Sequence, residues 1–401
     1  MSPLFLFNNR IFVLLFASSI FAVVGFSMFL TTTTWYVITD LGSAGTLGLV
    51  LIAATVPRIL MMAFGGLLAD KYKKTTIMFS TNLIQSILLL IIFILVSQDN
   101  MTLALLLILS GLFGMLDAFF GPASSSMIPK IVDRTLLQPA NAVFQGVDQI
   151  SFVIGPILAG FLMEQVSVSG SYLVTTGLVF LSAVLIFPPY IKESPVEKGT
   201  KQTPLQDLKV GFSYIRHSNF LLTGLLVLII LNFFVFGALH VAIPLLVDAY
   251  GGTPLNLSYM EVSLGIGLVV GTGFLSMIPI KRRGKTSLSG LVCALIAFII
   301  FSWVPNLILL TVVVFFIGLS MSFVFVPFFT AAQETTDIHV MGRVMSLIFL
   351  AMNGFDPVAY ALVSGLAAIQ IPIQFILFGL GVIGLMITIV LFFTSKPYQQ
   401  V

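Results

Sequence analysis

The chain has 401 residues, of which 58% are hydrophobic and 8% are charged, with a formal net charge of +3 and a mean hydropathy of +1.13. Soluble proteins carry roughly 25% charged residues because their surface faces water, so this composition excludes a soluble globular protein. The apolar runs are long and continuous rather than alternating, which excludes a membrane β-barrel and predicts an all-α membrane protein.

Stretches of roughly 20 apolar residues, the length that crosses a bilayer, predict twelve membrane-spanning helices. In the first half they cover residues 11–37, 43–68, 76–97, 103–124, 140–164 and 170–190. In the second half they cover residues 220–246, 256–280, 287–304, 307–331, 343–366 and 371–394. The divisions between spans 9 and 10 and between spans 11 and 12 are the weakest, because the connections there carry no charge.

The distribution of cations tests this count independently. All 18 Lys and Arg except Arg58 fall in or beside the loops on one side of the predicted bundle, and the opposite loops hold acids such as Asp40, Asp99 and Asp248. Cytoplasmic loops are enriched in Lys and Arg, so we expect both termini in the cytoplasm, an even number of spans, and a location in the inner or plasma membrane. Since topology explains the cations, the net charge gives no support for nucleic-acid binding.

One polar segment, residues 192–219, divides the chain into two predicted six-helix bundles, 1–191 and 220–401. Thr203, Pro204 and Gln206 form a helix-start pattern within this linker. Apolar residues then recur at helical spacing and predict a short amphipathic helix on the inner membrane surface: Leu205, Leu208, Phe212 and Ile215. A tether between the bundles is its simplest role. Two repeated halves are common in secondary transporters.

The loop after span 2 carries a recognisable motif. Gly66 permits close approach of another helix, and Asp70, four residues later, can pair with cations or a helix N-terminus. Together with Lys71 and Lys74, it resembles the G-x-x-x-D-[RK]-x-G-[RK]-[RK] signature of the major facilitator superfamily, except that Lys73 stands where the family has Gly. A chance basic cluster beside a helix is the alternative. The corresponding loop at 279–285 keeps the cations but lacks the acid.

Span 5 contains small residues around a Gly-Pro pair: Ser151, Gly155, Pro156, Ala159 and Gly160. The pattern is similar to the antiporter motif of the same superfamily, and the whole chain most resembles its macrolide and multidrug efflux branch. We expect these small residues to permit tight contact with a helix of the other half, although generic packing is the alternative. The resemblance implies the two-bundle fold and favours export over import.

Ionisable side chains inside a bilayer are expensive, so each is a functional candidate. The proton-coupling candidates are Asp117, Asp148, Asp356 and Glu261. Helical rise puts Asp117 and Asp148 at similar depth, where two facing carboxylates can share a proton. The alternative is that they only hydrogen-bond polar neighbours. The superfamily often places an Arg in helix 4, whereas Phe113 occupies that place here.

Arg58 and Asp356 both fall near mid-membrane, and helices 2 and 11 meet across the two halves of the superfamily's fold. We therefore expect a pair between these residues that forms in one alternating-access state and parts in the other. Glu261 lies near the outer end of span 8, where snorkelling to the interface is an equal alternative. We expect His240 to be a polar packing residue.

Helices 1, 4, 7 and 10 line the cavity in this superfamily, with neighbouring positions on helices 5 and 11. The resemblance therefore implies six candidate cavity residues: Phe26, Trp35, Phe119, Asn232, Phe236 and Asn353. The 38 Phe and 16 Met of the chain include side chains suited to a tolerant pocket for lipophilic ligands, although most will face lipid or pack helices.

These features predict a monomeric proton antiporter that exports lipophilic drugs or related amphiphiles, with no cofactor and no metal. An exporter of an endogenous lipid, siderophore or metabolite is the main alternative. A membrane enzyme is disfavoured because the three His (217, 240 and 339) are scattered, Cys293 is the single cysteine, and no phosphate-binding loop occurs. The chain contains no nucleotide-binding domain, so ATP is not its direct energy source.

Overall fold

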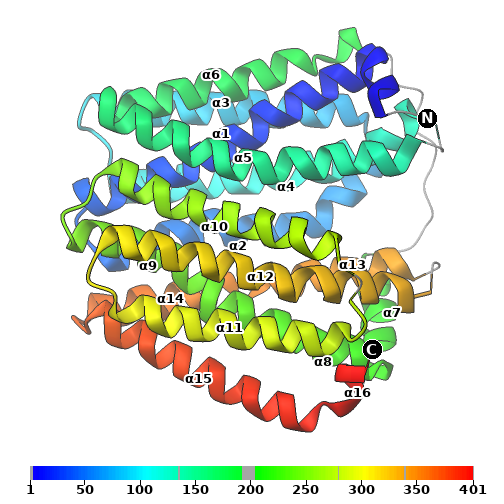
Figure 1. Ribbon diagram of the computed structural model, residues 1–401. Helices are drawn as coiled ribbons and strands as arrows, with labels where there is room; N and C mark the ends of the chain where they lie inside the picture. The colour runs from blue at the N-terminus through cyan, green and yellow to red at the C-terminus, as the bar shows by residue number, and fades with distance from the viewer. Residues whose placement is uncertain (1–2, 134–135, 192–203, 279, 338–339, 401) are drawn as a thin grey trace. The chain divides into compact units, whose positions relative to one another are not determined.

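The computed structural model describes residues 3–400 except 134–135, 192–203, 279 and 338–339 (Figure 1). The side chains of 3–5, 63–71, 138, 142 and 204–208 lie outside the description. The described residues form helices and no strand, and twelve helical segments are long and apolar enough to cross a membrane. The predicted all-α architecture with twelve spans is thereby confirmed.

The chain forms two compact units. The first comprises Met1–Leu41 and Val50–Lys201, and the second comprises Gly42–Leu49 and Gln202–Val401. The first six long helices are α1 (Arg10–Asp40), α2 (Ala44–Lys71), α3 (Lys74–Ser97), α4 (Leu103–Ile131), α5 (Leu137–Gln165) and α6 (Val168–Leu185), with short turns η1 (Pro3–Asn8) and η3 (Pro188–Tyr190).

Within the first unit, α1 packs against α5 and α6, and α3 packs against α4 and α6 (Figure 1). Buried hydroxyl groups join these helices across the apolar interior. Ser18 donates to the carbonyl of Ser182 at 3.0 Å, and the hydroxyls of Thr32 and Ser171 lie 2.7 Å apart. The side chain of Asn9 caps the start of α1 by accepting from the backbone of the first turn. Such polar bonds bind membrane helices where lipid gives no hydrophobic drive for association.

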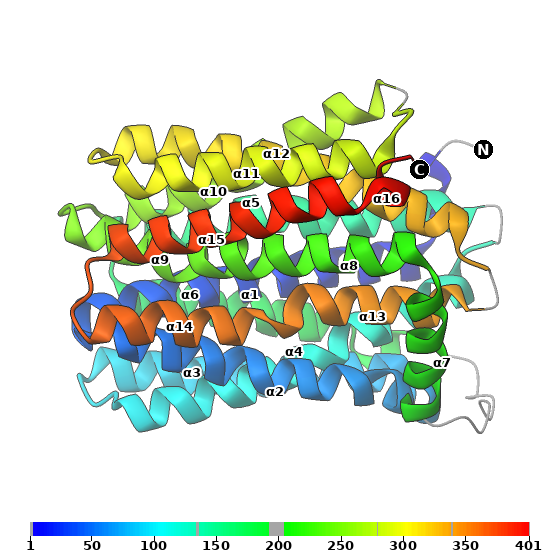
Figure 2. The same cartoon turned by 90° about the horizontal axis from the view of Figure 1, so that it is seen from below.

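The second unit continues with α7 (Pro204–His217), α8 (Asn219–Leu231), the π-helical turn η4 (Asn232–Phe236), α9 (Gly237–Ala249), α10 (Pro254–Ser276) and α11 (Arg283–Trp303). It ends with α12 (Leu307–Thr335), α13 (Met341–Gly354), α14 (Asp356–Ala368), α15 (Ile373–Thr394) and α16 (Lys396–Gln400). Figure 2 shows α7 crossing the ends of α8 and α13 rather than running along them.

The two weakest predicted divisions are present. Helix α11 ends at Trp303, and the side chain of Asn306 caps α12 by accepting from the backbone N–H groups of Ile308 and Leu309. Helix α14 ends at Ala368, and α15 begins at Ile373. Helices α4 and α12 run to Ile131 and Thr335, beyond their predicted spans. Backbone hydrogen bonds continue where hydropathy has already fallen, so an apolar run gives the minimum length of a helix.

Two spans of the second unit are interrupted. The seventh span, Asn219–Ala249, contains the π-turn η4 between α8 and α9. The eleventh span, Met341–Ala368, is broken at Phe355 between α13 and α14. Single π-turns and mid-membrane breaks concentrate at functional positions in membrane proteins.

Candidate functional site

The candidate site begins with the close approach of α2 and α4 in the first unit. A Cβ atom on Gly114 would lie 1.9 Å from the carbonyl oxygen of Ala54, and one on Gly111 would lie 3.3 Å from that of Ala53. The two glycines therefore let the backbones pack almost directly against each other. Since both helices run in the same direction along this contact, the next turn of each brings Arg58 beside Asp117.

Arg58 and Asp117 form an ion pair inside the predicted spans. The Nε atom of Arg58 lies 2.8 Å from Oδ2 of Asp117, and the two side chains are 35% and 21% exposed. Breaking a fully buried pair from one side costs about 3–5 kcal/mol, and the remaining exposure of both groups lowers that figure here. Asp117 on α4 thus has a basic partner that comes from α2. The resemblance implied an Arg on helix 4 itself, one turn earlier at the place of Phe113.

An aromatic ring lies over the guanidinium of Arg58. Its Cζ atom lies 4.7 Å from the ring centroid of Phe26, a geometry that favours a cation–π interaction. Phe26 stacks on Phe113 with centroids 6.1 Å apart, and Phe29 lies 4.2 Å from the same ring. Phe113 is 1% exposed, so it packs against α1 in the place where Arg was expected. Phe113, the departure seen in the sequence, thus stacks on Phe26, the ring that lies over Arg58.

Asp148 on α5 is the second acid near this pair. Its carboxylate lies within electrostatic range of Asp117, and its side chain is exposed. The structure therefore brings together Arg58, Asp117, Asp148 and the candidate cavity residue Phe26. A carboxylate with one basic partner and one acidic neighbour is suited to take up and release a proton.

The second unit contains a separate polar and aromatic cluster. Asp356 is the first residue of α14 and is 5% exposed, and a Cβ on Gly237 would lie 3.6 Å from its Cα. The π-turn begins at Asn232, whose side-chain amide donates to the carbonyl of Leu228 at 2.9 Å. One turn after Phe236, His240 lies edge-on between the rings of Phe236 and Tyr360, with centroids 4.6 Å and 6.1 Å away.

The small residues of α5 are buried, but Gly155 faces its own unit. A Cβ at this position would lie 2.5 Å from Cβ of Ser27 on α1. Ser151 and Ala159 are 1% and 0% exposed, and Pro156 and Gly160 are also buried. Gly155 contacts α1 because that helix also carries a small residue, Ser27, at this level, and the expected contact of the pattern with a helix of the other half stays a prediction.

The remaining predicted residues are dispersed. Glu261 on α10 and Phe119 on α4 are half-buried, and Trp35 on α1 is 7% exposed. Asn353, near the end of α13, donates to the carbonyl of Phe349 at 2.8 Å. In the motif after span 2, the side chains of Gly66, Asp70 and Lys71 lie outside the described residues, and Lys74 is buried at the start of α3. The pairing of Arg58 with Asp356, which belong to different units, stays a prediction.

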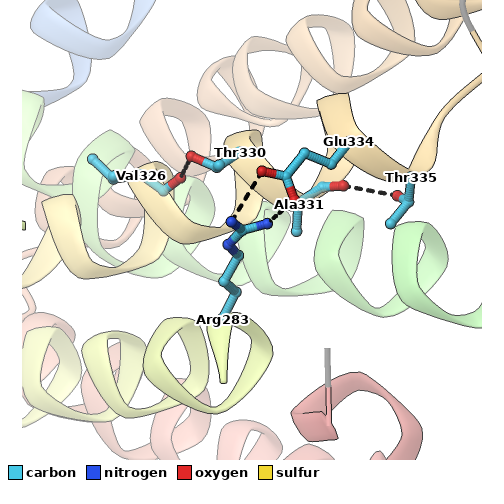
Figure 3. Close-up of polar contacts among 6 residues, drawn as sticks. All are labelled: Arg283, Val326, Thr330, Ala331, Glu334 and Thr335. Atoms are coloured by element: carbon cyan, nitrogen blue, oxygen red, sulfur yellow. Dashed lines mark hydrogen bonds and ion pairs between the residues drawn. The ribbon is translucent and has the colours of Figure 1, made fainter. Parts of the chain in front are cut away.

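Sequence reasoning missed the acid that complements the cations after span 8. Arg283, at the start of α11, makes a bidentate ion pair with Glu334 near the end of α12, including an Arg283 Nη2 to Glu334 Oε1 bond of 3.0 Å (Figure 3). The acid that this loop lacks is thus supplied by another helix. The position of Glu334 as a single acid at the end of an apolar span was the sequence signal that could have indicated this pair.

Among the described residues, no group of three or more His, Cys, Asp or Glu is arranged to hold a metal ion. The feature of the site in the first unit is a charge pair with a second acid nearby.

Comparison with known proteins agrees with this architecture. A sequence model of the Major Facilitator Superfamily matches residues 15–355. The uncharacterised MFS-type transporter YfiS of Bacillus subtilis is 26% identical over 75% of this chain and 73% of its own length. The multidrug efflux pump Tap of Mycolicibacterium fortuitum is 23% identical over 83% of both chains. Macrolide efflux protein A of Streptococcus pyogenes is 23% identical over 59% of both chains.

A crystal structure of the nucleoside transporter NupG superposes with a TM-score of 0.72. The alignment covers 96% of this chain and 99% of that one at 14% identity, a level that shows a shared fold and not a shared substrate.

Proposed function

This chain belongs to the Major Facilitator Superfamily, and we propose that it is a proton-coupled antiporter that exports lipophilic or amphiphilic small molecules by alternating access. The single observation that carries the proposal is the Arg58–Asp117 ion pair within two membrane spans. Ionisable side chains at that depth lower the stability of a membrane protein, so their presence favours a functional role. Two relatives that are named as efflux proteins support the direction of transport.

In the proposed cycle, Asp117 is the proton carrier. When it is ionised, it is held by Arg58 and supported by the rings of Phe26 and Phe113. A proton on Asp117 removes the Coulombic attraction, so Arg58 is released from its partner. Asp148, the second acid within electrostatic range of Asp117, is proposed as a further proton site of the same relay.

The released guanidinium is proposed to pair with Asp356 of the second unit in the alternate state. Exchange of partners would link the protonation of Asp117 to the movement of the two bundles, as alternating access requires. Exchanging the two charges, with Arg58→Asp and Asp356→Arg, should restore part of the transport that either single change removes. No restoration in the double variant would remove the support for direct pairing.

Substrate contact is proposed for the aromatic and amide side chains that the resemblance placed along the cavity: Phe26, Trp35, Phe119, Asn232, Phe236 and Asn353. Flexible and aromatic groups accept many apolar shapes, which suits a tolerant exporter. Gly66, Asp70, Lys71 and Lys74 are proposed to gate the ends of helices 2 and 3. Glu261 is proposed as a further coupling acid. The protein would act as a monomer in the cell membrane, with both termini in the cytoplasm.

The test is transport of a fluorescent cationic dye in proteoliposomes under an imposed pH gradient. The parent is compared with Asp117→Asn, Asp148→Asn and Asp356→Asn, and with Asp99→Asn as a control in the exposed loop after α3. We expect Asp117→Asn to abolish gradient-driven movement while the control keeps it. Unchanged coupling in Asp117→Asn would refute its role as carrier. A folded parent that moves no dye under any gradient would refute multidrug export and favour a narrow endogenous substrate.

A further inference from the structure

Helix α7 of the linker is fixed to the second unit by specific contacts. A Cβ on Gly211 would lie 3.0 Å from the carbonyl oxygen of Arg343, so the glycine lets α7 rest on the backbone of α13. Ile215 is 2% exposed. The hydroxyl of Tyr214 donates to the carbonyl of Thr335 at 3.4 Å and accepts from the N–H of Asp337 at 3.2 Å. The helix is therefore a fixed element of this unit rather than only a tether.

Only part of the predicted apolar face of α7 is buried in protein. Of that face, Phe212 is 59% exposed and Ile215 is covered. Val210, which is outside the predicted face, is 43% exposed. Because α7 crosses the ends of the spanning helices α8 and α13 (Figure 2), it lies where the headgroup region of a bilayer meets the unit. Exposed apolar side chains at that level favour contact with lipid.

Two cavities lie along α7, with volumes of about 560 and 590 Å³. The first is lined by Lys209, Arg216 and His217 together with the apolar residues Phe212 and Leu350. The second shares Ser213 and His217 with the first and adds the hydroxyl residues Tyr214 and Ser218. We call this pair of cavities the α7 groove. Among the described residues that line it there is no Asp or Glu, and its two full cations, Lys209 and Arg216, both line the first cavity.

The groove presents hydrogen-bond donors as well as charge. Nδ1 of His217 donates to the carbonyl of Ser213 at 2.7 Å, so this N–H is already used within the helix and the donors available to a ligand are those of Lys209, Arg216 and the hydroxyl groups. Lys209 and Arg216 are exposed and lie on the same helix as His217. Two full cations and a serine hydroxyl match the oxygen atoms of a phosphodiester.

We propose that the α7 groove binds the headgroup of an anionic phospholipid, with its phosphodiester among Lys209, Arg216 and His217. The acyl chains would leave past Phe212 and Leu350, which is 45% exposed. These apolar residues favour a lipid over a soluble phosphate, because burying acyl chains against them stabilises binding and a free anion has no apolar surface to bury. Basic grooves beside membrane helices are sites for acidic lipid headgroups in general. The site goes beyond the proposed transport function and does not depend on it.

The test is lipid binding to the delipidated, detergent-purified chain, measured by native mass spectrometry. Phosphatidylglycerol is compared with phosphatidylcholine of the same acyl chains. Lys209→Gln/Arg216→Gln removes both charges, and Arg282→Gln/Lys285→Gln is the matched control, because those exposed cations lie at the start of α11 outside the groove. Each cation near an acidic lipid contributes about fivefold, so we expect the preference for phosphatidylglycerol to fall roughly 30-fold in the first variant only.

Two further arms separate the sources of the phosphate group. Inorganic phosphate in excess should not displace phosphatidylglycerol from the parent, and Phe212→Ser should weaken phosphatidylglycerol binding while the cations remain. Displacement by inorganic phosphate, with no effect of Phe212→Ser, would overturn the lipid site in favour of a soluble anion. An equal loss in both charge variants, or no loss in either, would also overturn it. Thermal unfolding in detergent without added lipid verifies that each variant is folded.

Discussion

Adding one methyl group at Gly114 should separate α2 from α4 and disturb the ion pair. The new Cβ would lie 1.9 Å from the carbonyl oxygen of Ala54, whereas ordinary contact begins at about 3.4 Å, so the backbones must move apart by about 1.5 Å. The obstacle is backbone, which has no other rotamer to adopt. Overpacking of this kind costs about 1–3 kcal/mol. The movement occurs one turn from the 2.8 Å contact of Arg58 with Asp117, so that contact lengthens as well.

The matched control for Gly114→Ala is Gly121→Ala on the same helix, where a Cβ meets nothing within 4 Å. Both changes gain up to about 1 kcal/mol of helix propensity, so their difference isolates the contact. We expect Gly114→Ala to unfold several degrees below Gly121→Ala in detergent and to lose pH-driven dye transport that Gly121→Ala retains. Equal unfolding temperatures and equal transport would refute both the close approach and its role in placing Arg58.

Two further changes test contacts outside the site. Arg283→Gln removes the pair with Glu334, whose side chain is 58% exposed, so we expect a slight drop in unfolding temperature that disappears at high salt. The control is Arg282→Gln, and a drop many degrees larger than that of the control would contradict this expectation. Tyr398→Phe removes a 3.0 Å bond to Ser287 and should cost about 0.5–1.5 kcal/mol, with Tyr259→Phe as an exposed control. Burial also raises the pKa of Tyr398, so the stability it contributes is complete below its unfolded pKa of about 10 and is lost as pH rises further. Unfolding temperatures should thus fall less steeply above pH 10 in Tyr398→Phe than in the parent, and identical slopes would count against a buried phenol.

Most of the fold could be predicted because a bilayer imposes simple rules. The length of each apolar run and the cations beside it depend on that segment alone, so the spans can be predicted without knowing which helices are in contact. The short connection at Val304, Pro305 and Asn306 shows this well, because a proline and a capping Asn mark the division even without charge. The interruption at Asn232–Phe236 leaves no comparable trace, because the residues on both sides are mostly apolar. The break at Phe355 does leave one, since Gly354 precedes it and Asp356 and Pro357 follow it, but the continuous hydropathy of the span conceals it.

The candidate site was only partly predictable for the same reason. Depth in the membrane identified Asp117, Asp148 and Arg58 as unusual, but depth does not identify partners. The contact between α2 and α4 depends on Gly111 and Gly114, and glycine is too common in membrane spans to indicate which helix it faces. Glu334 was overlooked because its partner Arg283 is on another helix.

The ion pair of Arg58 with Asp117 also determines how this part of the chain responds to voltage. With both groups ionised, the pair has no net charge, so the membrane potential exerts no net force on it. In the proposed cycle, a proton on Asp117 adds one positive charge to this group whichever carboxylate Arg58 then pairs with, and one charge crossing 100 mV corresponds to about 2.3 kcal/mol. The cell's voltage would then act on the protonated state and leave the deprotonated state unaffected. Transport by this protein should accordingly depend on the electrical gradient in only one half of its cycle.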